Sequence, residues 1–152
     1  MKYQSIKKQL FIKCEAYIQE RISSIQDTLS ALSESKNSET KSSAGDKYET
    51  GRAMIQLEEN KNRTQLGQAL ALKHALASIS IEKVNTKGEL GSLIITNQFN
   101  YFLSVGVGKI TLENATYFCV SPGSPIGLKL LGKKKGGEIE INKNKIIIEG
   151  IY

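Results

Sequence analysis

The sequence has few of the residues that build metal or disulfide sites: two cysteines, one histidine and no tryptophan. Cys14 and Cys119 lie far apart, with no CxxC spacing and no companion histidine. A zinc site and a disulfide framework are therefore not indicated. Reduced, buried thiols are the expectation for both cysteines, and a structural role is the expectation for His74.

Long apolar runs are also missing, so no segment is predicted to span a membrane. The basic N-terminus, MKYQSIKKQLFIK, has no cleavage site typical of a signal peptide, and we expect a cytoplasmic protein. The net charge of +6 is evenly divided. Residues 1–84 carry 13 lysines and arginines against 10 acids, and residues 85–152 carry 8 against 5. This mild excess suits contact with nucleic acid or an acidic protein surface without defining a DNA-binding protein.

The first third of the chain has a helical pattern, from about residue 3 to residue 34. Its apolar residues recur at spacings of four and three, which is the seam of a coiled coil. The seam consists of Ile18, Ile22, Ile25, Leu29 and Leu32. Residues 33–46, SESKNSETKSSAGD, contain no large apolar residue and are predicted to form a loop.

A second helical pattern covers residues 47–80, and its apolar stripe is polar between Ile55 and Leu66. That part is predicted to pack loosely or to face a solvent-filled groove. Two helices of about 32 residues, each roughly 48 Å long and joined by a polar loop, predict an antiparallel hairpin. The hairpin domain is assigned to residues 1–84, with its exposed tip at about residues 35–50.

From Val84 onward, short β-branched and aromatic runs are separated by glycine, asparagine and lysine turns. These runs predict an antiparallel sheet of about five strands. Between the third and fourth strand, Ser124-Pro125 predicts the start of a short helix that ends at Gly132. Residues 85–152 are thus predicted to form a small sheet domain with one helix, and the fold class is α+β.

This order of elements resembles the bacterial Gre transcript-cleavage factors. Gly45-Asp46-x-x-Glu49 resembles the acidic tip motif of the family, and SPIGLKLLGKKKGGEIEIN (124–142) is similar to its helix-to-strand passage. The closing IIIEGIY also resembles the family's end. Departures occur at the tip: KNSETKSSA replaces an arginine-proline approach, and Thr50-Gly51 replaces Asn-Ala. The resemblance implies an FKBP-like C-terminal domain.

The resemblance further implies a monomer that activates an enzyme and has no activity of its own. The C-terminal domain would dock on bacterial RNA polymerase at the secondary channel, and the tip would reach the active centre. There Asp46 and Glu49 would help to hold a Mg²⁺ shared with the polymerase, which hydrolyses the backtracked RNA near its 3′ end. Lys47, Arg52, Ser124 and Pro125 are the candidate contacts to RNA or polymerase. The isolated protein is expected to bind no cofactor.

Several alternatives stay open. Asp46 and Glu49 also fit the start of a helix, where an N-cap and acidic residues are favoured. Lys36, Lys41, Lys47 and Arg52 surround the tip, and they fit either RNA phosphates or a solvated loop. The protein could occupy the channel without stimulating cleavage. A prolyl isomerase or chaperone role is ranked lower, because the aromatic residues are needed for the core.

Overall fold

A computed structural model describes residues 2–41 and 45–152 of the chain, and the side chains of residues 2–38 and 49–152. The elements are two long helices, four strands, a short helix and two more strands. The chain is divided into two compact units. One contains residues 18–73, and the other contains residues 1–17 together with residues 74–152. None of the described helices offers an apolar stretch long enough to cross a bilayer.

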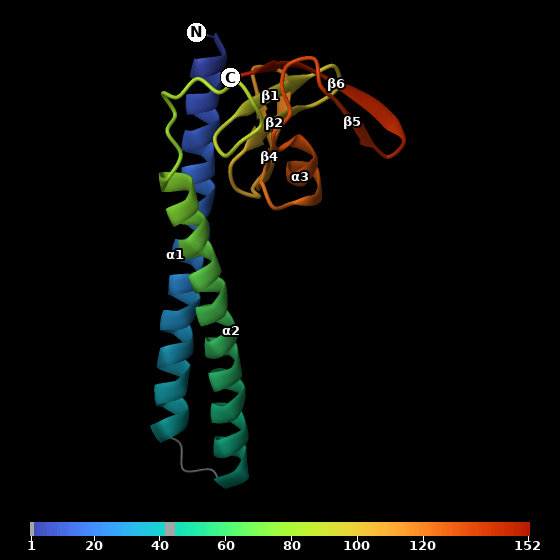
Figure 1. Ribbon diagram of the computed structural model, residues 1–152. Helices are drawn as coiled ribbons and strands as arrows, with labels where there is room; N and C mark the ends of the chain where they lie inside the picture. The colour runs from blue at the N-terminus through green and yellow to red at the C-terminus, as the bar shows by residue number, and fades with distance from the viewer. Residues whose placement is uncertain (1, 42–44) are drawn as a thin grey trace. The chain divides into compact units, whose positions relative to one another are not determined.

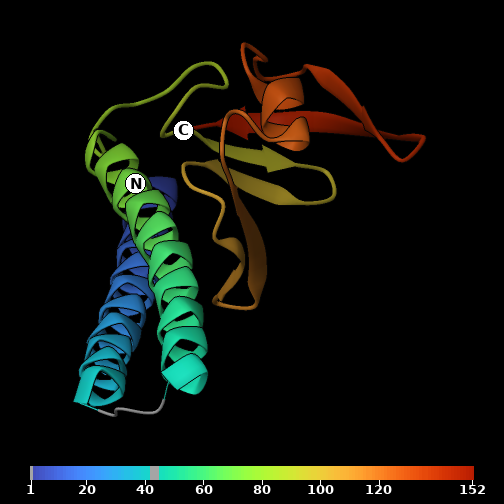
Figure 2. The same cartoon turned by 90° about the horizontal axis from the view of Figure 1, so that it is seen from below.

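The unit of residues 18–73 is the predicted antiparallel hairpin. Helix α1 (Lys2–Lys41) and helix α2 (Gly45–Ala77) run side by side in opposite directions (Figures 1 and 2). Lys73 near the end of α2 donates to Gln19 early in the hairpin, at 3.3 Å. The seam is confirmed at Ile18, Ile22 and Ile25, which are buried, while Leu29 and Leu32 are half-buried.

The predicted loop at residues 33–46 is wrong in its extent, since α1 continues to Lys41 and α2 already begins at Gly45. Residues 33–41 contain neither proline nor glycine, and their glutamates and lysines are good helix formers. A polar composition therefore did not end the helix there.

The polar stretch of α2 also differs from the expected groove. Glu59 and Asn62 are buried, with 6% and 9% of their surfaces exposed. Lys36 of α1 lies 3.5 Å from the Glu59 carboxylate and donates to the Gln56 amide oxygen at 2.6 Å. The hairpin thus carries a polar layer in which side chains of the two helices meet.

The second unit is built on a six-stranded sheet. Its strands are β1 (Leu93–Thr96), β2 (Asn100–Leu103), β3 (Gly108–Leu112), β4 (Ala115–Val120), β5 (Glu138–Ile141) and β6 (Asn144–Ile151). Their order across the sheet is β3-β4-β2-β1-β6-β5. The α+β class is confirmed, while the expectation of about five strands is corrected to six.

The sheet differs from the predicted one in two ways. The segment NYFLSVGVG (100–108) is not one continuous strand, because β2 ends at Leu103 and β3 begins at Gly108, with a turn closed by Val107 donating to Val105. The β2–β4 pair is parallel, so the sheet is mostly rather than wholly antiparallel. Parallel neighbours must be joined by a crossover, and here the crossover contains β3.

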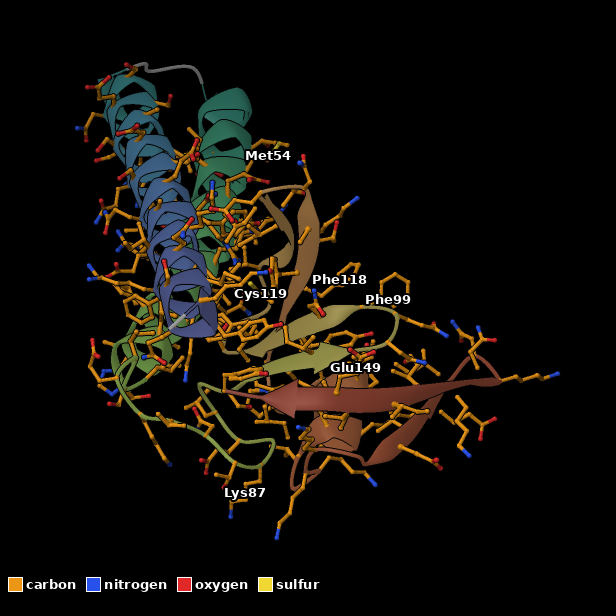
Figure 3. All side chains as sticks on the ribbon, turned by 90° about the horizontal axis from the view of Figure 1, so that it is seen from above. Met54, Lys87, Phe99, Phe118, Cys119 and Glu149 are labelled. Atoms are coloured by element: carbon orange, nitrogen blue, oxygen red, sulfur yellow. The ribbon has the colours of Figure 1, made fainter. Side chains whose placement is uncertain are left out.

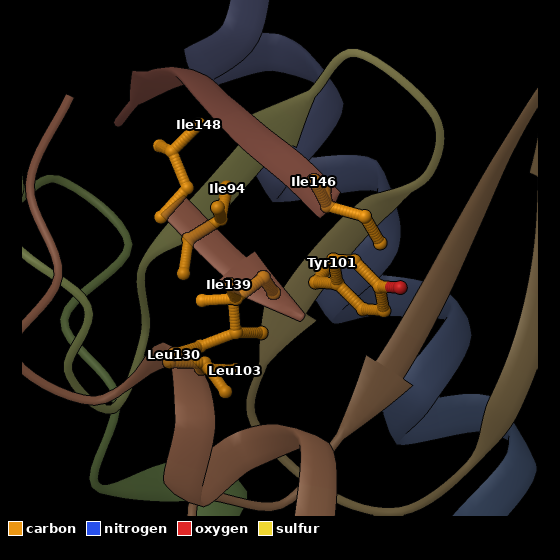
Figure 4. Packing of buried hydrophobic residues seen from close by; sticks show 7 residues of the cluster. All are labelled: Ile94, Tyr101, Leu103, Leu130, Ile139, Ile146 and Ile148. Carbon is orange, nitrogen blue, oxygen red and sulfur yellow. The ribbon is translucent and has the colours of Figure 1, made fainter. Parts of the chain in front are cut away.

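Helix α3 (Pro125–Leu130) forms where Ser-Pro predicted it. A hydrophobic cluster joins it to the sheet through fully buried Leu130, and the other buried members come from four strands (Figure 4). The other members are Ile94, Tyr101, Leu103, Ile139, Ile146 and Ile148. Phe118 extends the cluster, stacking edge-on against Phe99 with ring centroids 5.6 Å apart (Figure 3).

Residues 2–17 of α1 belong to the same unit as the sheet. The Tyr3 ring stacks on the Tyr152 ring at 4.1 Å, which brings the two ends of the chain together. Fully buried Lys7 donates to Asn85 at 2.7 Å and to the Lys83 carbonyl at 3.0 Å. The compact units therefore do not coincide with residues 1–84 and 85–152, and the division of roles between those two ranges stays a prediction.

The two cysteines meet inside this unit, and the expectation of buried, free thiols is confirmed. Both are fully buried, and each thiol is a hydrogen-bond partner of the other. The hydrogen bond from Cys119 lowers the pKa of Cys14, whereas contact with Cys14 and burial raise the pKa of Cys119.

Candidate functional site

The predicted acidic tip lies at the start of α2. Asp46 is the second residue of the helix, and Glu49 follows three residues later with an exposed side chain. The side chains of Asp46 and Lys47 lie outside the described residues. Positions 46 and 49 are three residues apart in α2, and residues at this spacing share one face of a helix.

A shallow hollow of about 340 Å³ lies beside Glu49. Its other lining residues are Lys36, Arg52, Ala53 and Gln56. One carboxylate therefore lies next to two cationic side chains that come from both helices of the hairpin. Lys36 is also engaged by Glu59 and Gln56, while Glu49 is accessible from outside.

The donor set at the tip is small for a resident metal ion. Among the described residues, no group of three or more histidine, cysteine, aspartate or glutamate side chains is placed to hold one. Mg²⁺, however, retains several waters and is commonly bound through one or two carboxylates plus groups of a substrate. Two carboxylates such as those of Asp46 and Glu49 have the chemistry for a shared ion of this kind, and their binding of one stays a prediction.

The capping alternative also has structural content. Because α2 begins at Gly45, Asp46 lies within the first turn and not ahead of it. Acidic side chains in the first turn interact favourably with the helix dipole. Both roles are compatible with the backbone, and they differ in what a neutral, isosteric substitution would do.

Ser124 and Pro125, the other candidate contacts, have a clear structural role. The Ser124 hydroxyl donates to the Ser121 carbonyl at 2.7 Å and accepts from the Gly127 amide at 3.0 Å. Pro125 occupies the first turn of α3, where a missing N–H is harmless. A Cβ atom at Gly127 would lie 2.0 Å from the Ser121 carbonyl oxygen, so the turn requires glycine there. Their contact with a partner remains a prediction.

The aromatic residues serve mainly the core, as expected. Tyr101, Phe102 and Tyr117 are buried, and burial raises the pKa of Tyr101 and of Tyr117. Phe99 and Tyr17 are exceptions, with 46% and 50% of their surfaces exposed. An aromatic-lined pocket of the isomerase type therefore gains no support from these side chains.

Sequence reasoning missed two features near candidate surfaces. The first is the Lys36–Glu59 pair. The sequence indicates it only through a glutamate, Glu59, that lies on the apolar stripe of α2. The second is a groove of about 510 Å³ between α3 and β5, lined by Leu128 and Leu131 among others. The sequence indicates this groove only through the run LKLL (128–131) at the end of α3, which has more leucines than one buried face of so short a helix needs.

No family model and no curated protein matches this sequence. Among solved structures, the chain is similar to the structure of the transcription factor Gfh1, with 15% sequence identity and a TM-score of 0.34. The alignment covers 95% of this chain and 92% of that chain. A TM-score of this size carries no argument, so the likeness to Gre factors remains one of motifs and of their order along this chain.

Proposed function

We propose that this protein is a Gre-like transcription factor that binds bacterial RNA polymerase and inserts its hairpin tip into the secondary channel. The observation that carries the proposal is the order of two motifs on matching elements. An acid pair opens the second helix of a hairpin, and the Ser-Pro motif opens the short helix that leads into β5. The positive charge of the chain is compatible with such a partner.

The proposed mechanism is stimulation of the polymerase's own RNA cleavage. Asp46 and Glu49 would contribute carboxylate oxygens to a Mg²⁺ ion shared with the polymerase. A pair of metal ions stabilises the attacking and the leaving oxygen during phosphodiester hydrolysis. Arg52, which lines the hollow beside Glu49, would attract the phosphates of the displaced RNA 3′ end.

The test is a backtracked elongation complex assembled with the cognate polymerase and end-labelled RNA. We expect the full chain to shorten the RNA on a gel. Asp46→Asn and Glu49→Gln should each lower the cleavage rate at least about tenfold, which corresponds to about 1.4 kcal/mol. Raising the Mg²⁺ concentration should partly restore the rate, because a weakened site refills by mass action.

The matched control is Glu58→Gln, which neutralises another exposed acid of α2. It should stimulate RNA cleavage as strongly as the wild type. All variants should compete equally for the polymerase. If the wild type binds but no RNA is shortened, the second candidate function holds, in which the hairpin occupies the channel without stimulating cleavage. If the full chain does not bind the polymerase at all, the proposal is wrong.

A further inference from the structure

Strand β5 forms one edge of the sheet. Among the described residues, it pairs along its length only with β6. The Lys129 ammonium donates to the Glu140 carbonyl at 2.5 Å, so this carbonyl faces away from β6. In an antiparallel strand the N–H and C=O of one residue point to the same side. The Glu140 N–H therefore also faces outward, where another strand can pair with it.

A groove of about 510 Å³ runs beside this edge, between α3 and β5. Figure 1 shows α3 next to the β5–β6 hairpin. On the helix side, Leu128 and Leu131 line the groove with 60% and 39% of their surfaces exposed. An edge strand beside a helix with exposed leucines offers backbone hydrogen bonds and apolar contacts to one extended chain. This combination is what strand addition uses.

The groove and the turn beside it carry more positive than negative charge. Lys129 and Lys133 line the groove together with Glu138 and Glu140, and the turn adds Lys134 and Lys135, which are exposed. Of the two glutamates, Glu138 is already engaged by Lys145 at 2.9 Å. A segment with carboxylates therefore complements this surface better than a basic or neutral one.

A fifth lysine is held against this turn by the backbone. Lys87 forms an isolated antiparallel bridge with Lys134, and Figure 3 shows its side chain extending from the ribbon. The Gly88 amide donates to the Lys133 carbonyl at 2.7 Å. A Cβ atom at Gly88 would lie 1.9 Å from the Leu130 carbonyl oxygen, so this pairing requires glycine. Like charges directly opposite each other are unfavourable in a sheet, and a bound carboxylate would relieve that repulsion.

We propose that the groove between α3 and β5 binds an extended acidic peptide segment of another protein as an additional strand on β5. The peptide carbonyl would accept from the Glu140 N–H, and a peptide N–H would replace Lys129 as donor to the Glu140 carbonyl. The released Lys129 ammonium would then pair with a carboxylate of the peptide. Apolar side chains at alternate peptide positions would contact Leu128 and Leu131. This inference does not depend on the hairpin or on polymerase binding.

The simpler role for Lys129 is protection of the edge, because proteins use lysines to prevent edge strands from pairing with other chains. The two roles differ in a measurable way. A protective lysine keeps peptides off β5, whereas a lysine that guards a binding groove yields to an acidic strand and favours it over a basic one.

The test is fluorescence anisotropy of the full chain with a labelled octapeptide of alternating valine and glutamate. We expect saturable binding below about 1 mM, an affinity that corresponds to about −4 kcal/mol. The same peptide with alternate backbone nitrogens methylated should bind at least about tenfold more weakly, since it lacks the donors for the ladder. A valine–lysine peptide should show no saturable binding.

Glu140→Pro is the sharpest variant, because it removes an outward N–H and leaves the bonds to β6 in place; proline is tolerated on edge strands. Glu140→Ala keeps the N–H and serves as the matched control. We expect binding to fall at least about tenfold for the proline variant only, with circular dichroism and thermal unfolding confirming that both variants fold. Lys133→Glu should weaken binding of the acidic peptide and strengthen binding of the basic one.

Three outcomes would overturn the inference. One is the absence of saturable binding of the acidic peptide. Another is equal affinity of the proline and alanine variants, which would place the peptide away from the edge of β5. The last is tighter binding of duplex DNA than of the peptide, with loss of both on Lys133→Glu, which would define a general polyanion surface.

Discussion

The core of the sheet unit is mainly apolar, whereas the hairpin unit buries charged and polar side chains beside its apolar seam. In the sheet unit, Leu93, Ile94 and Phe102 have no exposed surface, and the core joins strands that are distant in the sequence. In the hairpin unit, a row of isoleucines is followed by the buried carboxylate of Glu59 and the amide of Asn62. The difference indicates that the sheet unit depends on close packing of apolar side chains. The hairpin combines an apolar seam with a polar layer nearer the tip.

This contrast bears on function. A cooperative apolar core is sensitive to every change of volume, which suits a scaffold that presents fixed surfaces such as the groove beside β5. A hairpin held by a narrow seam tolerates change at its exposed end. Substitutions at the tip can therefore alter chemistry with little effect on the fold, and the predictions below measure that difference.

The largest effect is expected in the sheet core. Leu130→Ala removes a fully buried side chain and should lower the free energy of unfolding by about 3 kcal/mol. Leu128→Ala, in the same helix but 60% exposed, should change it by less than about 0.5 kcal/mol. Urea unfolding followed by circular dichroism measures both. Equal effects of the two substitutions would mean that α3 does not pack as described.

A comparable test concerns the buried lysine that ties α1 to the sheet. Lys7→Met leaves the oxygens of Asn85, Lys83 and Tyr152 without their shared donor, and we expect a loss of about 2 kcal/mol at neutral pH. Lys8→Met, at an exposed position, is the control and should be nearly neutral.

The burial of Lys7 should also make the stability of the protein depend on pH. Burial, and then the charge of Lys83, lower the pKa of Lys7 from its ordinary value of 10.5. The unfolded chain therefore binds this proton more tightly, and stability should rise with pH between the lowered pKa and 10.5. Lys7→Met should lack this component, so the difference between its free energy of unfolding and that of the wild type should grow as the pH rises through that window. An identical pH profile for the two proteins would contradict the assignment.

The sequence could predict those features that repeat locally. The seam of Ile18, Ile22 and Ile25 follows from its spacing, and α3 follows from Ser124 and Pro125, because a cap and a first-turn proline act within a few residues. The parallel β2–β4 pair and the contacts of residues 1–17 with the sheet join distant segments, and no local period encodes them. Lysine is rarely buried without partners, and its partners here come from distant segments, so local pattern offers no reason to place Lys7 in a core.

The candidate site was predictable to a similar degree. The motif placed Glu49 on the first turns of a helix, and the structure agrees. The hollow beside it depends on Lys36, which comes from the other helix, and it could only be seen once the pairing of the helices was known. The groove beside β5 likewise requires knowing which strand lies at the edge.

A smaller effect is expected from the polar layer of the hairpin. Glu59→Gln keeps the shape of the side chain and removes the charge that faces Lys36 at 3.5 Å. Breaking a fully buried ion pair costs several kcal/mol, but Lys36 is 26% exposed. We therefore expect about 1 kcal/mol, measured by thermal unfolding, against no change for Glu58→Gln. A stabilised Glu59→Gln would show that the layer serves the pairing of the helices and not stability.

The smallest effect on stability is expected at the tip. Glu49 is exposed, and neutralising one acid in the first turns of a helix costs about 0.3–1 kcal/mol. Glu49→Gln should therefore unfold within about 1 kcal/mol of the wild type, and Asp46→Asn, which keeps a side chain able to cap, should do the same.

If the acids mainly support the start of α2, the double variant should lose helix content by circular dichroism and keep any stimulation of RNA cleavage. If they share a metal ion with the polymerase, helix content should be unchanged while cleavage is lost. Because both properties are measured on one protein, the two roles of the acid pair give opposite results.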